Sequence, residues 1–300
     1  MDDQRSHIAR PTGWFCIGTS DEVRSEPRPL HHFGVELVVY RGESGQVVVF
    51  DAYCAHMGAH LGIGGRVTGD DIICPYHGWR WDRGGEVVEI PYSSRLNRAR
   101  QLKGWSVLEQ DGLVFIWHDE CGGEPAWEPP SFAELGAGGE QVMREDTVRM
   151  FPEMAVETAV DPAHVAFASA TALGAPTIVG KDEYLGVTHH SVGGDATAPV
   201  VVECWGVGVS RMQNATPMGG TFFTLATPVD DERTVLRTIA VGATAAEVQR
   251  RWAQLDRDIA IWENQRWART TTTDSEDDAD WAIVAGWAES LYSAGEVGRR

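Results

Sequence analysis

The sequence has few basic side chains and few cysteines, and it lacks any long apolar run. Its 300 residues include 25 lysines and arginines against 44 aspartates and glutamates, which gives a formal charge of −19. So acidic a chain is a poor ligand for nucleic acid or for an anionic membrane. No segment has the length of a transmembrane helix, and the polar residues 1–5 lack a secretory signal. We therefore expect a cytoplasmic protein with no membrane and no nucleic-acid partner.

Three of the five cysteines, Cys16, Cys121 and Cys204, are scattered along the chain. Such spacing does not suggest a disulfide framework, and it is typical of buried thiols in a reducing compartment. Apolar residues make up 43% of the chain, enough for two domains with cores of ordinary size.

The other two cysteines are each followed closely by a histidine. The chain carries Cys54-Ala-His56 and, after a gap of seventeen residues, Cys74-Pro-Tyr-His77. Two thiolates on one iron and two imidazoles on the other form the ligand set of a Rieske [2Fe–2S] cluster. Glycines at positions 58 and 78 provide permissive backbone where two loops would close around a cluster. The pattern predicts a protein that transfers electrons.

A structural zinc site is the main alternative for the same four side chains, because Cys and His also suit zinc. Zinc sites usually pair like ligands, as C-x₂₋₄-C and H-x₃₋₅-H, whereas each cysteine here is paired with a histidine. The mixed pairing favours the cluster over zinc, and over an incidental grouping of Cys and His in a core.

Turn residues and apolar runs divide the chain into two parts. Up to about residue 120, short β-branched and aromatic runs alternate with glycines, which indicates an all-β domain. These expected strands are 35–40, 46–50, 71–73 and 113–117. Residues 121–139 are rich in proline and glycine, as expected at a boundary.

The second part contains strand-like runs as well as segments with apolar residues at the three- and four-residue steps of a helix, so we expect an α+β domain. The expected strands are 141–150, 183–191, 199–210, 220–227 and 234–241. The expected helices are 153–170, 245–268 and 278–293, and residues 270–280 are expected to form a solvated loop.

With these motifs in place, the chain resembles the terminal oxygenase (α) components of Rieske non-haem iron oxygenases, and among them those of the 3-ketosteroid 9α-hydroxylases. The likeness lies in Gly13-Trp14-Phe15, Cys54-Ala-His56-Met57-Gly58, residues 74–81, residues 112–118 and residues 258–264. The resemblance implies a Rieske domain over residues 1–120 and a helix-grip (START-like) domain over residues 121–300.

The same resemblance implies a mononuclear Fe(II) in the second domain and a trimer in which each cluster supplies the iron of its neighbour. Electrons would come from NAD(P)H through a reductase or ferredoxin. They would pass from His77 across the subunit interface to Asp161. The iron would then hydroxylate or desaturate a steroid-like or polycyclic apolar substrate.

The expected iron site departs from the family pattern, in which two histidines and one carboxylate hold the metal. Asp161 and His164 match the pattern, and Asp258 falls where the carboxylate ligand is expected. Thr158 stands in place of an asparagine, and Ser169 stands in place of the second histidine. A neutral hydroxyl is a poor ligand for Fe(II) compared with imidazole. One ligand of three is therefore missing from the pattern.

Each of these residues also has a purely structural interpretation. Asp161 precedes a proline and could be an ordinary helix N-cap. His164 could be a histidine of the core, and Asp258 could be an exposed charge on a long helix. His189 and His190, on an expected strand, could replace the missing ligand. Strand alternation would send only one of them inward, and a solvent-facing strand histidine is the competing interpretation.

Two further hypotheses follow from the serine at position 169. The chain could be an electron-transfer or architectural subunit with a degenerate iron site, working in a hetero-oligomer with a complete homologue. It could also be a biosynthetic enzyme with altered chemistry in a repurposed pocket.

Overall fold

The structure is a computed structural model, and it describes residues 10–136, 140–161, 164, 174–190, 199–214, 220–265 and 279–292. The chain divides into two compact units. One consists of Cys16–His118, and the other of the described residues before Cys16 together with those from Asp119 onward. The change of unit lies close to the boundary expected from the Pro- and Gly-rich stretch.

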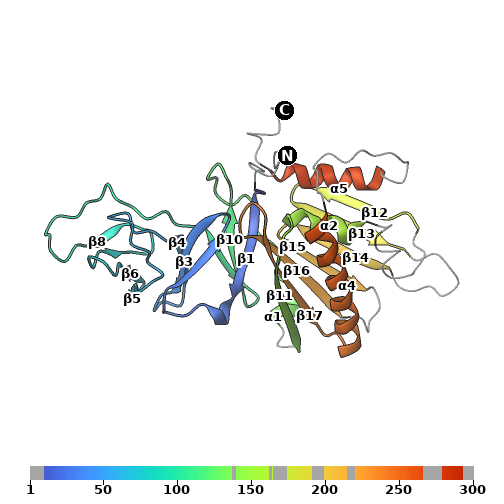
Figure 1. The fold of residues 1–300 in the computed structure, drawn as a ribbon, viewed down its shortest axis with the longest axis horizontal. Helices are drawn as coiled ribbons and strands as arrows, with labels where there is room; N and C mark the ends of the chain where they lie inside the picture. Colours follow the sequence, from blue (N-terminus) through green and yellow to red (C-terminus); the bar gives the residue numbers. More distant parts are fainter. Residues whose placement is uncertain are drawn as a thin grey trace. The chain divides into compact units, whose positions relative to one another are not determined.

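The Cys16–His118 unit is built from short strands, as the sequence predicts (Figure 1). Its strands form three sheets with the orders β1-β10-β9, β2-β3-β4 and β5-β6-β7-β8. The elements are β1 (Gly13–Thr19), η1 (Ser20–Glu22), β2 (Arg28–His32), β3 (Val35–Arg41), β4 (Val47–Asp51), β5 (Arg66–Thr68), β6 (Asp71–Ile73), β7 (Arg80–Trp81), β8 (Val87–Glu89), β9 (Val107–Gln110) and β10 (Leu113–His118).

An apolar cluster in the core of this unit includes two of the cysteines. Cys54 and Cys74 are buried there beside Leu61, Ile72 and Trp81, which are fully buried. Because both cysteines belong to the core, the loops that carry them are anchored by the packing that folds the unit.

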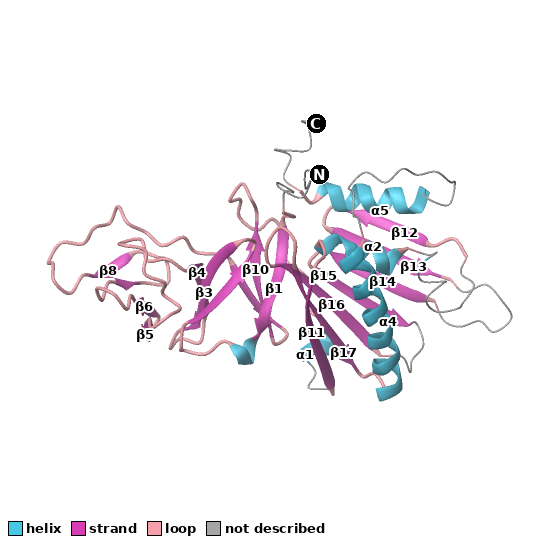
Figure 2. Ribbon diagram, in the orientation of Figure 1, coloured by secondary structure: helices cyan, strands magenta, loops and turns pink. Residues whose placement is uncertain are grey.

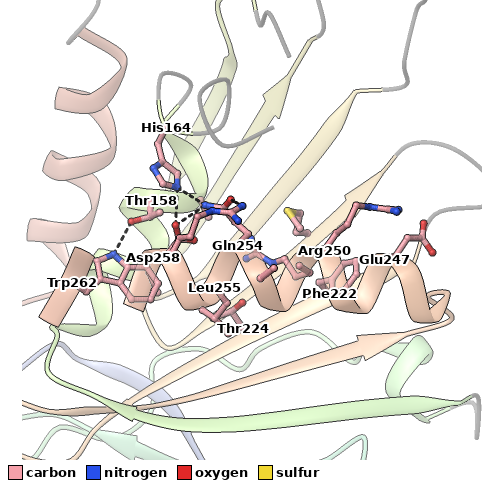
Figure 3. A pocket seen from close by; sticks show the side chains of 16 residues that line it. Thr158, His164, Phe222, Thr224, Glu247, Arg250, Gln254, Leu255, Asp258 and Trp262 are labelled. Atoms are coloured by element: carbon pink, nitrogen blue, oxygen red, sulfur yellow. Dashed lines mark hydrogen bonds and ion pairs between the residues drawn. The ribbon is translucent and has the colours of Figure 1, made fainter. Parts of the chain in front are cut away.

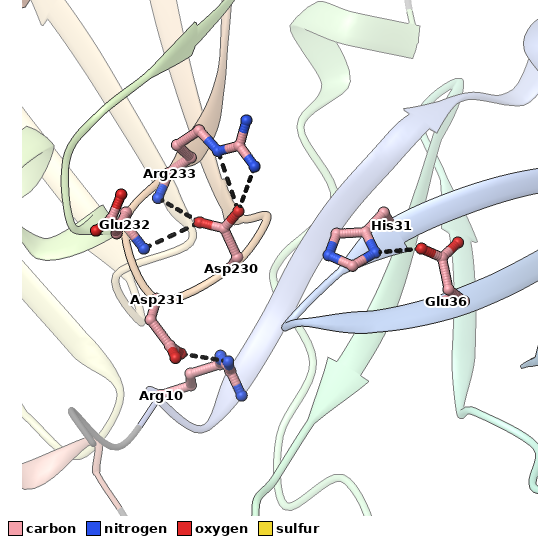
Figure 4. A network of polar contacts seen from close by, with 7 residues as sticks. All are labelled: Arg10, His31, Glu36, Asp230, Asp231, Glu232 and Arg233. Carbon is pink, nitrogen blue, oxygen red and sulfur yellow. Dashed lines mark hydrogen bonds and ion pairs between the residues drawn. The ribbon is translucent and has the colours of Figure 1, made fainter. Parts of the chain in front are cut away.

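Glu36 on β3 contacts one of these loops as well as the neighbouring strand. His31 on β2 lies directly opposite Glu36 on β3, and its Nδ1 is 2.8 Å from Glu36 Oε1 (Figure 4). The other oxygen of Glu36 lies 3.8 Å from Nε2 of His60, which follows the Cys54 loop.

The second unit is a seven-stranded antiparallel sheet with the order β11-β17-β16-β15-β14-β13-β12. Figure 1 shows α2 and α4 lying across one face of this sheet, with α5 along β12, and Figure 2 shows the same mixture of helix and strand. The elements are α1 (Ala133–Gly136), β11 (Gln141–Val148), α2 (Pro152–Val160), β12 (Thr177–Lys181), β13 (Tyr184–His189), β14 (Val200–Trp205), β15 (Val209–Asn214), β16 (Thr221–Pro228), β17 (Thr234–Val241), α4 (Ala245–Asn264) and α5 (Ala279–Ser290).

Helix α4 is the long helix of this unit, and its sequence fixes both its start and its buried face. Thr244 and Glu247 form a capping box, in which each side chain bonds to the backbone N–H of the other. Val248, Leu255 and Trp262, together with Asp258, then follow at helical spacing and are buried. A carboxylate on the buried face of a helix is unusual and needs a partner.

The β16–β17 hairpin is closed by a carboxylate (Figure 4). Asp230 accepts hydrogen bonds from the backbone N–H groups of Glu232 and Arg233 and from the guanidinium of Arg233. The adjacent Asp231 is paired with Arg10. These contacts satisfy the turn's backbone donors and tie the N-terminal segment to the hairpin.

Several boundaries differ from the sequence predictions. The segment expected as one strand over 199–210 is a hairpin, because Gly206 turns the chain at a positive φ of 58°. Strand β12 is outside the expected strands, because only two of its five residues, Ile178 and Val179, are apolar and its side chains are mostly exposed. The helix expected over 153–170 is described from Pro152 to Val160, and most of the rest lies outside the described residues. Residues 270–278 also lie outside them. None of the helices described has the length and apolarity needed to cross a membrane.

Candidate functional site

The two Cys–His loops have the same backbone turn. The N–H of Gly58 donates to the carbonyl of Cys54 at 2.9 Å, and the N–H of Gly78 donates to the carbonyl of Cys74 at 3.1 Å. Each glycine lies in the left-handed region, with φ of 73° and 71°. Glycine adopts this conformation without the penalty that a side chain brings. The two loops thus present their cysteines and histidines from matching turns.

The cysteine sulfurs meet inside the unit. Cys54 and Cys74 are each 3% exposed, and their side chains are hydrogen-bonded to one another. This bond lowers the pKa of the Cys74 thiol to about 6 and raises that of Cys54, so one thiolate is favoured. Backbone N–H groups of His56, Tyr76 and His77 also bond to these sulfurs. Donors that stabilise thiolate are what a metal–sulfur cluster requires.

The two histidines lie beside each other, with ring centroids 4.8 Å apart. The Nδ1 atom of His56 and the Nδ1 atom of His77 are both buried and have no hydrogen-bond partner. A buried polar nitrogen without a partner costs free energy, and metal coordination would satisfy it. Both loops therefore direct an unsatisfied imidazole nitrogen inward.

Aromatic rings flank the two imidazoles. Trp79 stacks on His56 with a centroid distance of 4.2 Å and an interplanar angle of 9°, and its indole N–H donates to the hydroxyl of Tyr92 at 2.7 Å. Tyr76 lies 3.8 Å from the ring of His77. Both tyrosines are largely exposed. The histidines thus sit at the edge of the unit, while the cysteines lie in its core.

The four side chains fall into two pairs. The two cysteines are buried in the core, and the two imidazoles lie side by side with ring centroids 4.8 Å apart. A Rieske cluster takes two thiolates on one iron and two imidazoles on the other, so this pairing suits it.

A second candidate site lies in the other unit, in a cavity of about 560 Å³ beside α4 (Figure 3). Its apolar wall includes Ala155, Met212, Phe222, Leu255 and Trp262. Cavities of this size and lining are typical of small-molecule sites.

Three polar side chains converge at one end of the cavity, as the dashed lines in Figure 3 show. His164 Nε2 lies 3.2 Å from Asp258 Oδ1. The side-chain amide nitrogen of Gln254 donates to the same carboxylate oxygen at 2.7 Å and lies 3.4 Å from His164 Nε2. The hydrogen bond to Asp258 raises the pKa of His164.

Asp258 is only 3% exposed, so the expectation of an exposed helix charge is wrong. The cause is its position on the same buried face of α4 as Leu255 and Trp262. His164 is half-buried, and its imidazole has a carboxylate partner in place of a purely apolar core. Two donor atoms each about 2.1 Å from one metal ion at right angles lie roughly 3 Å apart. The separation between His164 and Asp258 therefore fits a shared ion.

The neighbouring residues Asp161 and Thr158 make structural contacts. Asp161 accepts a hydrogen bond from the backbone N–H of His164 at 3.1 Å, which is the N-cap contact expected for an aspartate before a proline. Thr158 accepts a hydrogen bond from the indole of Trp262 at 3.1 Å. The first contact is local, and the second ties the end of α2 to α4.

The candidate replacement histidines separate as strand alternation predicts. His190 is exposed, whereas His189 is 1% exposed, so the expectation of a solvent-facing histidine is wrong for His189. Its Nε2 lies 3.3 Å from the carbonyl oxygen of Ala159 on α2, and burial lowers its pKa. The described lining of the cavity includes His164 and Asp258 but not His189. Ser169 lies outside the described residues.

Two residues of this site were missed in the sequence. Gln254 and Arg251 precede Asp258 by four and seven residues, so a helix places all three on one face. Arg251 lines the cavity, its Nε is buried without a partner, and burial lowers its pKa while Asp258 opposes that effect. The helical spacing to Asp258 was the available signal.

Two protein families match the chain. Residues 13–106 match the Rieske [2Fe-2S] domain, and residues 116–292 match the 3-ketosteroid 9alpha-hydroxylase C-terminal domain.

Similar individual proteins include steroid oxidoreductases. A cholesterol 7-desaturase from Hemicentrotus pulcherrimus is 36% identical over 171 residues, covering 55% of this chain and 36% of that protein. The oxygenase component of a 3-ketosteroid-9-alpha-monooxygenase from Rhodococcus rhodochrous is 41% identical over 114 residues, covering 38% of this chain and 29% of that protein. The matches thus span about a third of the length of these relatives.

Solved structures share the fold over nearly the whole chain. Dicamba monooxygenase bound to dicamba superposes with a TM-score of 0.72 at 18% identity, covering 93% of this chain and 96% of that one. NdmA of Pseudomonas putida CBB5 with caffeine gives 0.72 at 18% identity, covering 93% and 89%.

Proposed function

Because the chain belongs to the Rieske oxygenases that carry a 3-ketosteroid 9alpha-hydroxylase C-terminal domain, we propose that it is an oxygenase component acting on a polycyclic apolar substrate. The observation that carries the proposal is the His164–Asp258 pair at the end of a cavity of about 560 Å³. A metal site that opens into a cavity of substrate size is the arrangement an oxygenase needs.

We propose that Cys54, His56, Cys74 and His77 hold the [2Fe–2S] cluster. Two matching turns, two paired sulfurs and two buried Nδ1 atoms without partners support this ligand set. The cluster would supply single electrons. The protein's part is to keep the sulfurs in the core, to donate backbone N–H groups to them and to leave the imidazoles at the edge of the unit.

His164 and Asp258 are the proposed ligands of the mononuclear iron. Their separation of 3.2 Å and the burial of Asp258 support the assignment. Ferrous iron held by imidazole and carboxylate supplies O₂ chemistry. Around it, the hydrogen bond from the indole of Trp262 to Thr158 ties the end of α2 to α4, and the apolar wall would orient the substrate.

A steroid or similar ring system suits the apolar wall of the cavity. Phe222, Leu255 and Trp262 offer flat and branched surfaces, and most of the polar lining side chains come from α4. The similarity to a cholesterol 7-desaturase and to a 3-ketosteroid monooxygenase supports this substrate class. The substrate would be oriented by packing, with its reacting carbon at the His164 end.

Electrons are proposed to enter from a ferredoxin or an NAD(P)H-dependent reductase and to cross between subunits of a cytoplasmic homotrimer. In that scheme His77 of one subunit faces Asp161 of the next. The family of the chain supports the electron partner, and the hydrogen bond from the backbone N–H of His164 places the Asp161 carboxylate next to the proposed ligand.

Anaerobic reconstitution with Fe(II) and sulfide tests the proposal. We expect about three irons and about two acid-labile sulfides per chain, and oxidation of a steroid when a reductase and NAD(P)H are added. Zinc without sulfide would disprove the cluster. Iron that stays at two per chain would favour an electron-transfer subunit instead.

A further inference from the structure

We propose that Gln254 is the third protein ligand of the mononuclear iron, through its side-chain oxygen. The inference rests on the proposed function and deepens it. It accounts for an iron site in a chain that has serine where its family has a second histidine.

The geometry of three side chains supports this role. Asp258 Oδ1 lies 2.7 Å from the amide nitrogen of Gln254 and 3.2 Å from His164 Nε2. The amide nitrogen of Gln254 lies 3.4 Å from His164 Nε2. Three ligand atoms on one face of an octahedral ion lie roughly 3 Å apart in each pair, and the Gln254 oxygen would take the position that its amide nitrogen holds here. Gln254 and Asp258 are four residues apart on α4, so the helix itself brings both toward His164 (Figure 3).

No acidic, histidine or cysteine side chain among the described residues competes for this position. None joins His164 and Asp258 to make a group of three. His189 has a buried Nδ1 without a hydrogen-bond partner, but its Nε2 lies 3.3 Å from the carbonyl oxygen of Ala159 and it is absent from the described lining of the cavity. Gln254 is the polar side chain that touches both proposed ligands.

The orientation of the Gln254 amide depends on what occupies the space between the three side chains. Without a cation, its NH₂ group donates to Asp258 and its oxygen accepts from Arg257 at 2.5 Å. A cation beside Asp258 repels an N–H dipole and attracts a carbonyl oxygen. A half-turn of the amide exchanges the two groups in place, and the exposed Arg257 returns to water at little cost.

This ligand set has a chemical consequence. Replacing a neutral imidazole by a neutral amide oxygen leaves the charge of the site unchanged but gives a harder donor, which holds Fe(II) less tightly. The site would therefore bind its iron more weakly than a set of two histidines and one carboxylate, and Gln254→His should strengthen it.

The experiment measures metal binding directly, without turnover. Cluster-loaded protein is titrated anaerobically with Fe(II), and the difference spectrum with Co(II) reports the ligand field. The variants are Gln254→Leu and Gln254→His. Gln249→Leu is the matched control, because Gln249 is an exposed glutamine on the same helix. Sulfide content and thermal unfolding confirm that each variant is folded.

We expect Gln254→Leu to weaken Fe(II) binding about tenfold or more and to alter the Co(II) spectrum. Gln254→His should tighten Fe(II) binding and give a Co(II) spectrum that differs from those of the parent and of Gln254→Leu. Gln249→Leu should match the parent in both measurements.

If the parent binds iron and both Gln254 variants match it, the ligand role is overturned while the proposed function stands. A weaker affinity with an unchanged Co(II) spectrum also overturns it, because Gln254 would then act only as a donor to Asp258. If neither the parent nor Gln254→His binds a mononuclear iron, the proposed oxygenase function itself fails.

Discussion

The two candidate metal centres are built in opposite ways. The cluster loops take all four proposed ligands from two short turns, Cys54–Gly58 and Cys74–Gly78, that repeat the same hydrogen bond. The cavity site takes its side chains from α4 and from His164, which are about ninety residues apart in sequence. One centre is defined by local sequence, and the other by tertiary packing.

The surroundings of the two centres differ as well. Cys54 and Cys74 belong to the apolar core of their unit, so cluster and core support each other. His164, Gln254 and Asp258 line an open cavity, where their hydrogen bonds to one another hold them in place. A local, core-embedded site tolerates little change, whereas a site assembled by packing can exchange one ligand and persist.

The largest expected effect comes from Cys74→Ala. Loss of one buried sulfur ligand should remove the cluster altogether and leave a gap in the core of the Cys16–His118 unit. Acid-labile sulfide and the visible spectrum measure the loss. The control is Cys121→Ala, because Cys121 is an exposed free cysteine. A variant that keeps its full sulfide content would contradict the assignment.

Asp258→Asn should affect only the other centre. Removing the carboxylate charge should weaken Fe(II) binding roughly a hundredfold, since a neutral amide is a much poorer partner for a cation. Sulfide content should stay at the level of the parent. Asp256→Asn is the matched control, because Asp256 is exposed on the same helix and pairs with Arg144 at 2.6 Å. Equal iron affinity in both variants would show that Asp258 is not a ligand of the iron.

The same contrast explains what the sequence could predict. Spacing within Cys54-Ala-His56 and Cys74-Pro-Tyr-His77 identifies the cluster motif, because the ligands are local. The all-β first part and the α+β second part followed from periodicity. Hairpins such as β14–β15 were missed because Gly206 interrupts a run of strand-forming residues that otherwise reads as continuous.

The cavity site was only partly predictable. His164 and Asp258 were found through resemblance, and spacing alone suggested an exposed Asp258. Gln254 carries no motif, and its importance depends on a contact with His164 that only folding creates. Burial of His189 followed from alternation in principle, but nothing in the sequence says which face of β13 packs on α2.

A smaller effect distinguishes the two matching turns. Gly78→Ala should destabilise its unit more than Gly58→Ala, although both glycines have nearly the same φ. Left-handed backbone costs an alanine about 1–2 kcal/mol at either position. At Gly78 the new Cβ would also lie 3.0 Å from Pro91 Cγ, whereas at Gly58 nothing lies within 4 Å. Thermal unfolding of the cluster-loaded variants measures the difference. Equal losses of stability in the two variants would show that Pro91 moves away from the new Cβ at no cost.

The smallest expected effect concerns the ring that covers a proposed cluster ligand. Trp79→Phe keeps an aromatic face against His56 but removes the indole N–H that donates to Tyr92 at 2.7 Å. A neutral hydrogen bond contributes about 1 kcal/mol, and less here because the exposed Tyr92 hydroxyl can bond to water. In a double-mutant cycle of unfolding free energies, Trp79→Phe and Tyr92→Phe should therefore show a coupling of about 0.5–1 kcal/mol. Zero coupling would mean that the bond to Tyr92 contributes nothing to stability, and that packing against His56 and Trp81 holds Trp79 in place.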